Sequence, residues 1–373
     1  MKKLIAVTLV LSLAVSLAGC CCVNLPTDKL EGLFTKKPEP TVPAVQTEPL
    51  ESEPPAPAVS EDNPYYDCWR DHADYVLPDS DTTYFGRADI VDLSDAEREI
   101  AKQEIYARHG RSFSDPDLQE YFTARSWYAP GTETELNDCE EDNLFLLDVF
   151  QKQQTGEIRS SRYIRQMRDP NYYAMADSDS RYLRASDLSN LEHDYLVVVR
   201  NEIFARHGYI FGSDNLQTYF YCTDWYRPNP DFTNKSFNKY EHANATLCEL
   251  YERKLEGVKF SSKNPYKQYY YGPNTQILSY SSNQYLNDYD LWYMTKDELA
   301  LARNEILARN GYTFESENLL QFFLQCDWYK PDSPPGSTGS LGLSKIETAN
   351  IDLIKDMEDY LESTGEDMIV SAW

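Results

Sequence analysis

A seven-residue segment occurs three times in this chain of 373 residues, and the repetition limits the fold more than any other feature. The copies occupy residues 104–110, 202–208 and 305–311. Each copy is followed, at the same distances, by two adjacent aromatic residues, a Trp-Tyr pair and a proline. A segment that recurs together with its flanks marks a repeated structural unit. The sequence therefore predicts three tandem modules of one fold.

Each repeated segment is predicted to lie at the end of a long helix. Ser94 and Thr295 each have a glutamate three residues later, the pattern of a capping box at a helix N-terminus. In the second copy the same pattern begins at Ser189, about one turn earlier than the common register. Apolar residues follow at helical spacing, and the final glycine of each copy is expected to close the helix.

Two further helices and a turn complete each predicted module. A short helix is expected at residues 118–122 and their copies, and the proline after each Trp-Tyr pair predicts a turn. Longer helices are expected at 140–152, 241–255 and 346–361, and short extended pieces near Tyr84, Tyr182 and Tyr285. The fold class is therefore mainly α. The predicted boundaries are 64–154 for module 1, 176–256 for module 2 and 280–361 for module 3.

The first twenty residues predict export and a lipid anchor. Lys2 and Lys3 precede an apolar run at residues 4–17, which is shorter than the about 20 residues of a membrane-spanning helix. Small residues then precede Cys20, and this segment resembles the lipobox of bacterial lipoproteins. The resemblance implies that residues 1–19 are a signal peptide and that lipid on Cys20 holds the chain on the outer face of the cell membrane. An ordinary secretory signal with a chance cysteine is the alternative.

Residues 20–63 are predicted to form a disordered tether. The segment is rich in proline and glutamate and nearly lacks aromatic residues. Such a composition buries too little apolar surface to offset the entropy of ordering. Proline and like charges keep a chain extended, so the segment is expected to act as a spacer between the membrane and the modules.

The charge of the chain excludes nucleic acid as its main partner. Lysine and arginine number 35 against 61 aspartates and glutamates, which gives a net charge of −26. Binding to nucleic acid requires clustered cations that displace counterions from phosphate, and no long basic run is present. The expected partners are the membrane, through the lipidated N-terminus, and a cell-wall or protein ligand.

Five cysteines follow the predicted anchor region, and their spacing matches no zinc-binding pattern. In an exported protein some of them are able to pair, with Cys222–Cys248 and Cys68–Cys139 as the candidate disulfides. The alternative is that all five are reduced and buried as small apolar residues. The five are Cys68, Cys139, Cys222, Cys248 and Cys326.

The segment Tyr106-Ala107-Arg108-His109-Gly110 resembles the signature of the YARHG domain, a bacterial extracellular module. The resemblance extends over nearly all of the predicted folded part. It implies an exported protein, often anchored to a membrane or lipid, with no established biochemical activity. The later copies depart from the signature at Phe204, Leu307 and Asn310, so no role that needs the phenol or the imidazole is available in every module.

The repeated polar residues allow a catalytic and a structural interpretation. Glu104 and Arg108 are four residues apart on the predicted helix, the favourable order for an ion pair, and His109 follows at its C-terminus. A hydrolase would use the histidine as a general base, with sites in modules 1 and 2. The structural interpretation, which we favour, is that the Glu-Arg pair clamps the helix end against the Trp-Tyr turn while His or Asn caps the last carbonyls.

The Trp-Tyr pairs are expected to lie in the core, although aromatic pairs also serve as stacking surfaces for ligands. The acidic turns at Asp79–Asp81 and Asp177–Asp179 lack the spacing of a calcium loop, and no metal or other cofactor is expected. We therefore expect a binding module and not an enzyme. The candidate motif residues are Glu104, Arg108, His109, Trp127, Tyr128, Glu202, Arg206, His207, Trp225, Tyr226, Glu305, Arg309, Trp328 and Tyr329.

Overall fold

The structure is a computed structural model that describes residues 58–339 and 341–368. The predicted signal peptide, the lipid attachment at Cys20 and the tether up to residue 57 lie outside the described residues. Within the described part, no helix is both long enough and apolar enough to cross a membrane.

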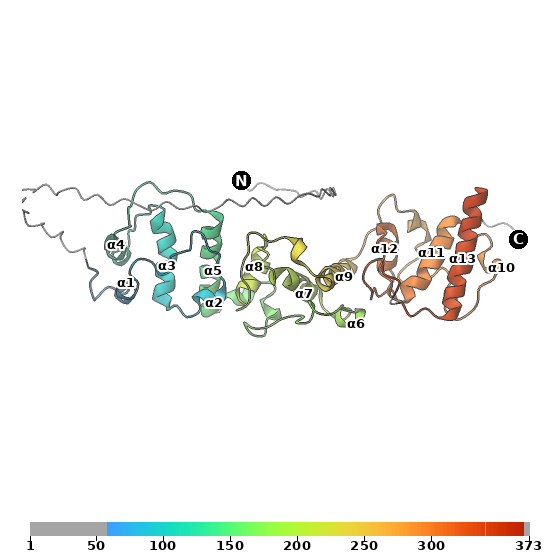
Figure 1. Cartoon of the computed structure of the whole chain (residues 1–373), viewed down its shortest axis with the longest axis horizontal. Helices are drawn as coiled ribbons and strands as arrows, with labels where there is room; N and C mark the ends of the chain where they lie inside the picture. Colours follow the sequence, from blue (N-terminus) through green and yellow to red (C-terminus); the bar gives the residue numbers. More distant parts are fainter. Residues whose placement is uncertain (1–57, 340, 369–373) are drawn as a thin grey trace, which may run out of the picture. The chain divides into compact units, whose positions relative to one another are not determined.

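Each module contains two long helices with a short helix between them, which confirms the mainly α fold (Figure 1). Residues 58–339 and 341–368 contain no β-strand, only an isolated bridge between Thr295 and Met368. The extended segments near Tyr84, Tyr182 and Tyr285 are therefore unpaired. The helices are α3 (Asp95–Arg108), α4 (Pro116–Thr123) and α5 (Asp138–Thr155) in module 1; α7 (His193–Ala205), α8 (Asp214–Tyr221) and α9 (Lys239–Glu256) in module 2; and α11 (Lys296–Arg309), α12 (Glu317–Leu324) and α13 (Lys345–Thr364) in module 3.

The ends of the first long helix follow the prediction in modules 1 and 3. Ser94 and Thr295 form capping boxes. The prediction for Ser189 is wrong, because α7 begins at His193 in the common register, and Ser189 instead ends the short helix α6 (Ala185–Leu188). The buried contacts of α7 fix this register without a side-chain cap. The closing glycines adopt left-handed φ angles of 84°, 81° and 78° at Gly110, Gly208 and Gly311.

A short helix precedes each first long helix, and an aspartate at the same position caps it in every module. In module 1 this helix is α2 (Arg87–Ile90), and the Asp89 carboxylate accepts a hydrogen bond from the Gly86 amide at 2.9 Å. Such a bond satisfies an amide that the helix itself leaves free. The counterparts are Asp187 in α6 and Asp290 in α10 (Asp288–Leu291). The remaining short elements are α1 (Tyr66–Asp71), η1 (Glu157–Ser160), η2 (Ile164–Gln166), η3 (Asn234–Ser236) and η4 (Pro265–Tyr269).

A buried asparagine on the second long helix holds the extended segment of each module. In module 1, the Asn143 side-chain amide donates to the carbonyls of Ser80 and Thr83 at 2.9 and 2.8 Å. Its oxygen accepts from the Phe85 amide at 2.9 Å. Asn244 and Asn350 make the equivalent three bonds in modules 2 and 3. One side chain thus satisfies three backbone groups of a segment that is not paired with any strand.

All five cysteines in the described part are free and buried. The disulfides suggested for Cys222–Cys248 and Cys68–Cys139 are therefore absent, and the alternative of reduced cysteines packed as small apolar residues is confirmed. Burial raises the pKa of the Cys68 and Cys139 thiols to about 11, which suppresses the reactive thiolate.

The modules extend upstream of their predicted boundaries. Val59 and Asn63 are buried, and the Asn63 side-chain amide donates to the Asp117 carbonyl of α4 at 2.9 Å. The last residues of the predicted tether therefore pack on module 1. The segment between modules 1 and 2 is also packed, with Ile158 and Tyr163 buried. Composition could not reveal this, because a short polar segment gains its order from the surface on which it lies.

Modules 1 and 2 meet through the face that α2 and α5 share. The Tyr221 hydroxyl at the end of α8 donates to the Asp142 carboxylate of α5. Arg227 donates to Asp89 at 2.8 Å, and Arg87 pairs with Asp224. Buried side chains of both modules, including Val149 and Tyr221, belong to one apolar cluster.

Modules 2 and 3 use the equivalent face. Leu250 of α9 belongs to the apolar cluster of module 3, together with Leu324 at the end of α12. The Lys254 ammonium donates to the carbonyls of Cys326 and Tyr329, both at 2.8 Å. Arg253 adds an ion pair with Glu317 at 2.6 Å. The second long helix of one module therefore binds the short helix of the next.

The contact between modules 1 and 2 is predicted to weaken as pH rises. Burial raises the pKa of Asp142 to about 6 from 3.8, so the folded chain holds this proton more tightly than the unfolded chain. The contribution is present below pH 4 and is lost as pH rises through 6, with a size of about 1–3 kcal/mol. Urea unfolding at a series of pH values should show a smaller loss for Asp142→Asn than for the original chain, and the part that remains comes from other buried carboxyls such as Glu104. Asp62 is an exposed carboxylate outside the interface, so the control Asp62→Asn should lose stability with rising pH as much as the original chain does.

Candidate functional site

The repeated glutamate is buried in every module and bonds to backbone amides. Glu104 is fully buried, and its two carboxylate oxygens each accept from the Val76 amide at 3.0 Å. Glu202 accepts from the amides of Ala174 and Met175, and Glu305 from that of Ile277. The glutamate therefore fastens the first long helix to a segment near the start of the module, upstream of that helix.

The arginine one turn later holds the same upstream segment by its carbonyls. Arg108 donates to the Leu77 carbonyl at 2.9 Å and to the Ser80 hydroxyl at 3.0 Å. The counterparts Arg206 and Arg309 donate to the carbonyls of Met175 and Leu278 at 3.0 and 2.8 Å. In modules 2 and 3 the arginine also bonds directly to the glutamate. The acidic segment at Asp79–Asp81 is therefore a turn that this arginine holds in place.

The predicted clamp between the Glu-Arg pair and the Trp-Tyr turn is indirect. In module 1 the Arg108 guanidinium lies over the Tyr75 ring at 4.1 Å, and that ring lies 4.7 Å from the Trp127 ring. In module 2, Arg206, Tyr173 and Trp225 repeat this stack, at 4.9 and 4.7 Å. A cation over an aromatic face is attracted by the ring quadrupole. Module 3 has Gln276 at the position of the tyrosine and lacks the stack.

The residue at the histidine position joins the first long helix to the second. His109 Nε2 lies 2.7 Å from the Glu140 carboxylate, and His207 Nε2 lies 2.6 Å from that of Glu241. Asn310 donates to Glu347 at 2.9 Å, and it alone also bonds to a helix carbonyl, that of Ile306. The predicted capping of the last carbonyls by a side chain therefore holds only for module 3.

The polar atoms of the Trp-Tyr pairs donate hydrogen bonds to backbone carbonyls of their own module. Trp127 Nε1 donates to the Asp74 carbonyl at 3.1 Å, and the Tyr128 hydroxyl donates to the Arg111 carbonyl at 2.9 Å. The counterpart bonds of Trp225, Tyr226, Trp328 and Tyr329 run from 2.8 to 3.1 Å. Tyr226 and Tyr329 are fully buried, whereas the tryptophans are half-buried. The prediction of a core role is confirmed for these two tyrosines and holds in part for the tryptophans.

Burial raises the pKa of Glu104 to about 7, against the opposing effect of the Val76 and Leu77 amides and of Arg108 and Arg125. The pKa of Glu202 and Glu305 is raised by the same cause. A raised carboxyl pKa is typical of catalytic acids as well as of buried structural groups. Here the glutamate is fully buried in modules 1 and 2, so its carboxylate is closed to solvent and to a substrate.

Module 1 contains one arrangement with the order of a hydrolytic relay, which sequence reasoning missed. The Thr134 hydroxyl lies 2.6 Å from His109 Nδ1, while Nε2 of the same ring faces Glu140. A hydroxyl, an imidazole and a carboxylate in this order can activate the hydroxyl as a nucleophile. Module 2 has Phe232 at the position of Thr134. The relay is therefore confined to module 1 among the three.

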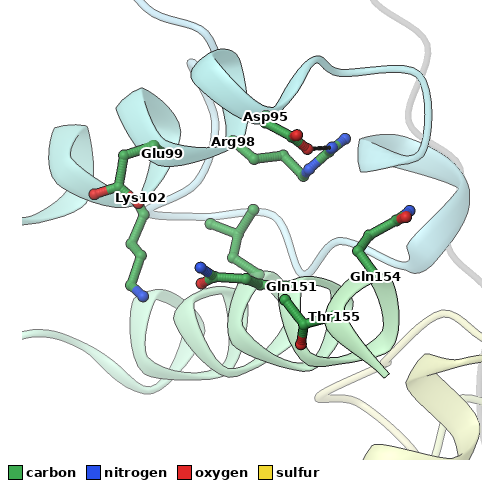
Figure 2. Close-up of a pocket in the computed structure, with 8 residues that line it drawn as sticks. Asp95, Arg98, Glu99, Lys102, Gln151, Gln154 and Thr155 are labelled. Atoms are coloured by element: carbon green, nitrogen blue, oxygen red, sulfur yellow. Dashed lines mark hydrogen bonds and ion pairs between the residues drawn. The ribbon is translucent and has the colours of Figure 1, made fainter. Parts of the chain in front are cut away.

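A hollow of about 240 Å³ lies between α3 and α5 of module 1 (Figure 2). Figure 2 shows Lys102 and Gln151 at its sides and the ion pair of Asp95 with Arg98 at one end. In module 2 the equivalent space is bridged by Arg200 and Glu252 at 2.8 Å. In module 3 the pair Arg303–Glu358, also at 2.8 Å, bridges it. Gln151 carries no charge, so the hollow of module 1 stays open.

Within the described residues, no group of His, Cys, Asp and Glu side chains is arranged to hold a metal ion. Comparison with protein families gave a match to the YARHG domain model at residues 73–152, 171–253 and 274–359. No curated protein and no solved structure matched the chain. The three matches cover most of the part that the structure describes, and two of them begin upstream of the predicted boundaries at 176 and 280.

Replacing His109 by asparagine is predicted to be tolerated, because Asn310 fills the same position in module 3. His109→Asn should change the free energy of unfolding by less than about 1 kcal/mol. His109→Leu should cost about 1–3 kcal/mol, since it leaves the buried Glu140 carboxylate without this partner. Urea unfolding of both variants tests the structural role. Equal losses would contradict it.

Removing the buried glutamate is predicted to be far more damaging than removing an exposed one. Glu202→Ala leaves the Arg206 guanidinium and two amides without their acceptor, so we expect a loss of about 3–5 kcal/mol. Asp67→Ala breaks the exposed pair with Arg70 and should leave the free energy of unfolding nearly unchanged. Both values come from the urea midpoint of the same chain. Similar small losses would show that the carboxylate is not a structural anchor.

Proposed function

This chain belongs to the YARHG domain family, and from that premise we propose that it is a binding protein held by a lipid anchor on the outer face of the cell membrane. Its three modules would present surfaces to a cell-wall or protein ligand. The residues that give the family its signature would serve the fold and not a reaction.

One observation carries the proposal. The carboxylate of the repeated glutamate accepts from backbone amides, and one terminal nitrogen of the repeated arginine donates to a backbone carbonyl, in all three copies. The guanidinium Nε of each arginine has no partner, but it is buried inside the module, as is the glutamate carboxylate. A substrate could therefore not reach these groups without disrupting the fold. Binding would therefore use surfaces that differ between the modules.

The open hollow of module 1 supports the proposal, because it is one such difference. Lys102 offers a cation there, and Gln151, Gln154 and Thr155 offer amide and hydroxyl groups. A small set of polar groups around a hollow suits recognition of a polar ligand. The predicted tether would add reach, and three modules on one chain would raise the effective concentration for a ligand with repeated units.

The proposal predicts capture of a ligand by the folded part of the chain. Residues 58–373, immobilised, should retain material from fragmented cell wall or from a cell lysate. Gln151→Glu should weaken retention about tenfold if the hollow is used, because the new carboxylate can bridge to Lys102 as Glu252 does to Arg200.

The control for this change is Gln268→Glu, which adds the same charge at an exposed position on η4 of module 3. It should leave retention unchanged. An absence of retained material from both sources would overturn the proposal as a whole.

A hydrolase is the second candidate, and the Thr134–His109–Glu140 relay supports it. This candidate requires that Thr134→Ala and His109→Asn abolish a hydrolytic activity while the chain stays folded. A fluorophosphonate probe, which reacts with activated hydroxyls, should then label the original chain and neither variant. Absence of labelling, together with the tolerance predicted above for His109→Asn, would leave the relay with a structural role.

A further inference from the structure

The end of module 3 presents the same face that modules 1 and 2 use to bind their neighbours. In module 1 this face is formed by α2 and α5, and in module 2 by α6, where the Ala185 amide donates to Asp332, and α9. In module 3 the equivalent elements are α10 and α13. A hollow of about 700 Å³ lies there, lined by residues of both elements, including Asp288, Leu353, Asp356 and Asp359.

The residues of this end face differ from their counterparts at the occupied faces. Val149 and Leu250, each 3 % exposed, fill the centre of the two interfaces, and the same position in module 3 is the exposed Asp356. Arg87 pairs with the next module, and its counterpart is Asp288. With Asp352 and Asp359, both exposed, the end face carries four aspartates.

Exposed tyrosines lie beside these aspartates. Tyr289 in α10 is 71 % exposed, and Tyr285 and Tyr293 on its two sides are 64 % and 67 % exposed. At the positions of Tyr289 and Tyr293, modules 1 and 2 have only small or polar residues: Ala88, Asp92, Ser186 and Asn190. A surface whose only task is to end the repeat and keep the chain soluble needs polar residues, and added aromatic rings oppose that task.

The outer end of module 1 in a second copy of this chain does not match the end face. The residue that enters the occupied faces is Tyr221 or Leu324, and module 1 has the exposed Thr123 at that position. The cation that accompanies it is Arg227 in module 2, and its counterpart in module 1 is Ala129. The free end of module 1 therefore lacks both the apolar and the basic partner that the end face would require.

We propose that this end face of module 3, formed by Asp288, Tyr289, Asp352, Asp356 and Asp359, is a docking surface for a basic polypeptide segment of another protein. The inference deepens the proposed binding function and rests on it. Four carboxylates attract lysine and arginine, and the tyrosine rings favour cations over their faces. The equivalent faces of modules 1 and 2 both hold polypeptide, and the first receives an arginine on Asp89.

Synthetic 15-residue peptides of alternating arginine and leucine test the inference, with glutamine in place of arginine for the neutral set. Fluorescence polarisation with the full chain in detergent measures the affinity. We expect the basic peptide to bind and the neutral peptide not to bind. The triple variant Asp288→Asn, Asp356→Asn and Asp359→Asn should weaken binding at least about tenfold, and Tyr289→Ala at least about threefold.

A charge-matched control separates the end face from the general negative charge of the chain. Glu61, Glu135 and Glu249 are exposed and lie away from the end face, and their triple change to glutamine should alter the affinity less than about twofold. Equal weakening by the two triple variants would overturn the inference. So would equal binding of the original chain to vesicles of cationic lipid, since the surface would then not be specific for polypeptide.

Two further outcomes distinguish this inference from the proposed function. If residues 58–373 retain a ligand that the end-face variants still retain, the binding function stands and the docking surface is wrong. The double variant Thr123→Leu and Asp356→Leu restores apolar residues at both contact positions. If this variant associates head to tail and the original chain binds no basic peptide, the end face only terminates the repeat. Either result rejects the docking surface and leaves the proposed binding function to be decided by its own test.

Discussion

The bond between a buried carboxylate and backbone amides is the interaction on which each module depends. Glu104 and its two counterparts hold the segment at the start of the module against the first long helix, and the arginine one turn later holds the carbonyls of that segment. A buried charge is tolerated only where hydrogen bonds replace its hydration. The pair therefore occurs as a unit in every copy, while the neighbouring Tyr75 and His109 have substitutes in module 3.

Other buried polar side chains of the module also bond to several groups at once. The Glu140 carboxylate caps the second long helix and also meets His109 from the end of the first. Asn143, one turn further along, satisfies three backbone groups of the extended segment. A unit this small has little apolar surface to bury, so a few fully bonded polar side chains give it a specific arrangement. This explains why the repeated residues are mostly polar although the proposed role is not catalytic.

Differences between the copies carry the functional information. The positions that build the module are nearly the same three times, whereas the hollow beside Lys102 and the end face around Asp356 each occur once. Stacked repeats need interfaces between neighbours and different surfaces at the two ends of the array. The aromatic residues of the module 3 end go beyond that need, and for this reason the proposed partner is placed there.

The sequence by itself determined the three modules, their helices and the closing glycines, because a repeat of caps, apolar spacing and glycine depends on local geometry. It also singled out Glu104 and Arg108, whereas the role of Asn143 came from the structure. The sequence could not determine the partners of these residues, since amides 28 residues away or carbonyls 63 residues away become neighbours only after folding. Nor could it decide where α7 begins, because buried contacts place the start at His193 although the sequence pattern at Ser189 resembles a capping box. The reduced state of the cysteines was likewise left open. Which faces of the modules meet, and which remains open, follows from packing alone.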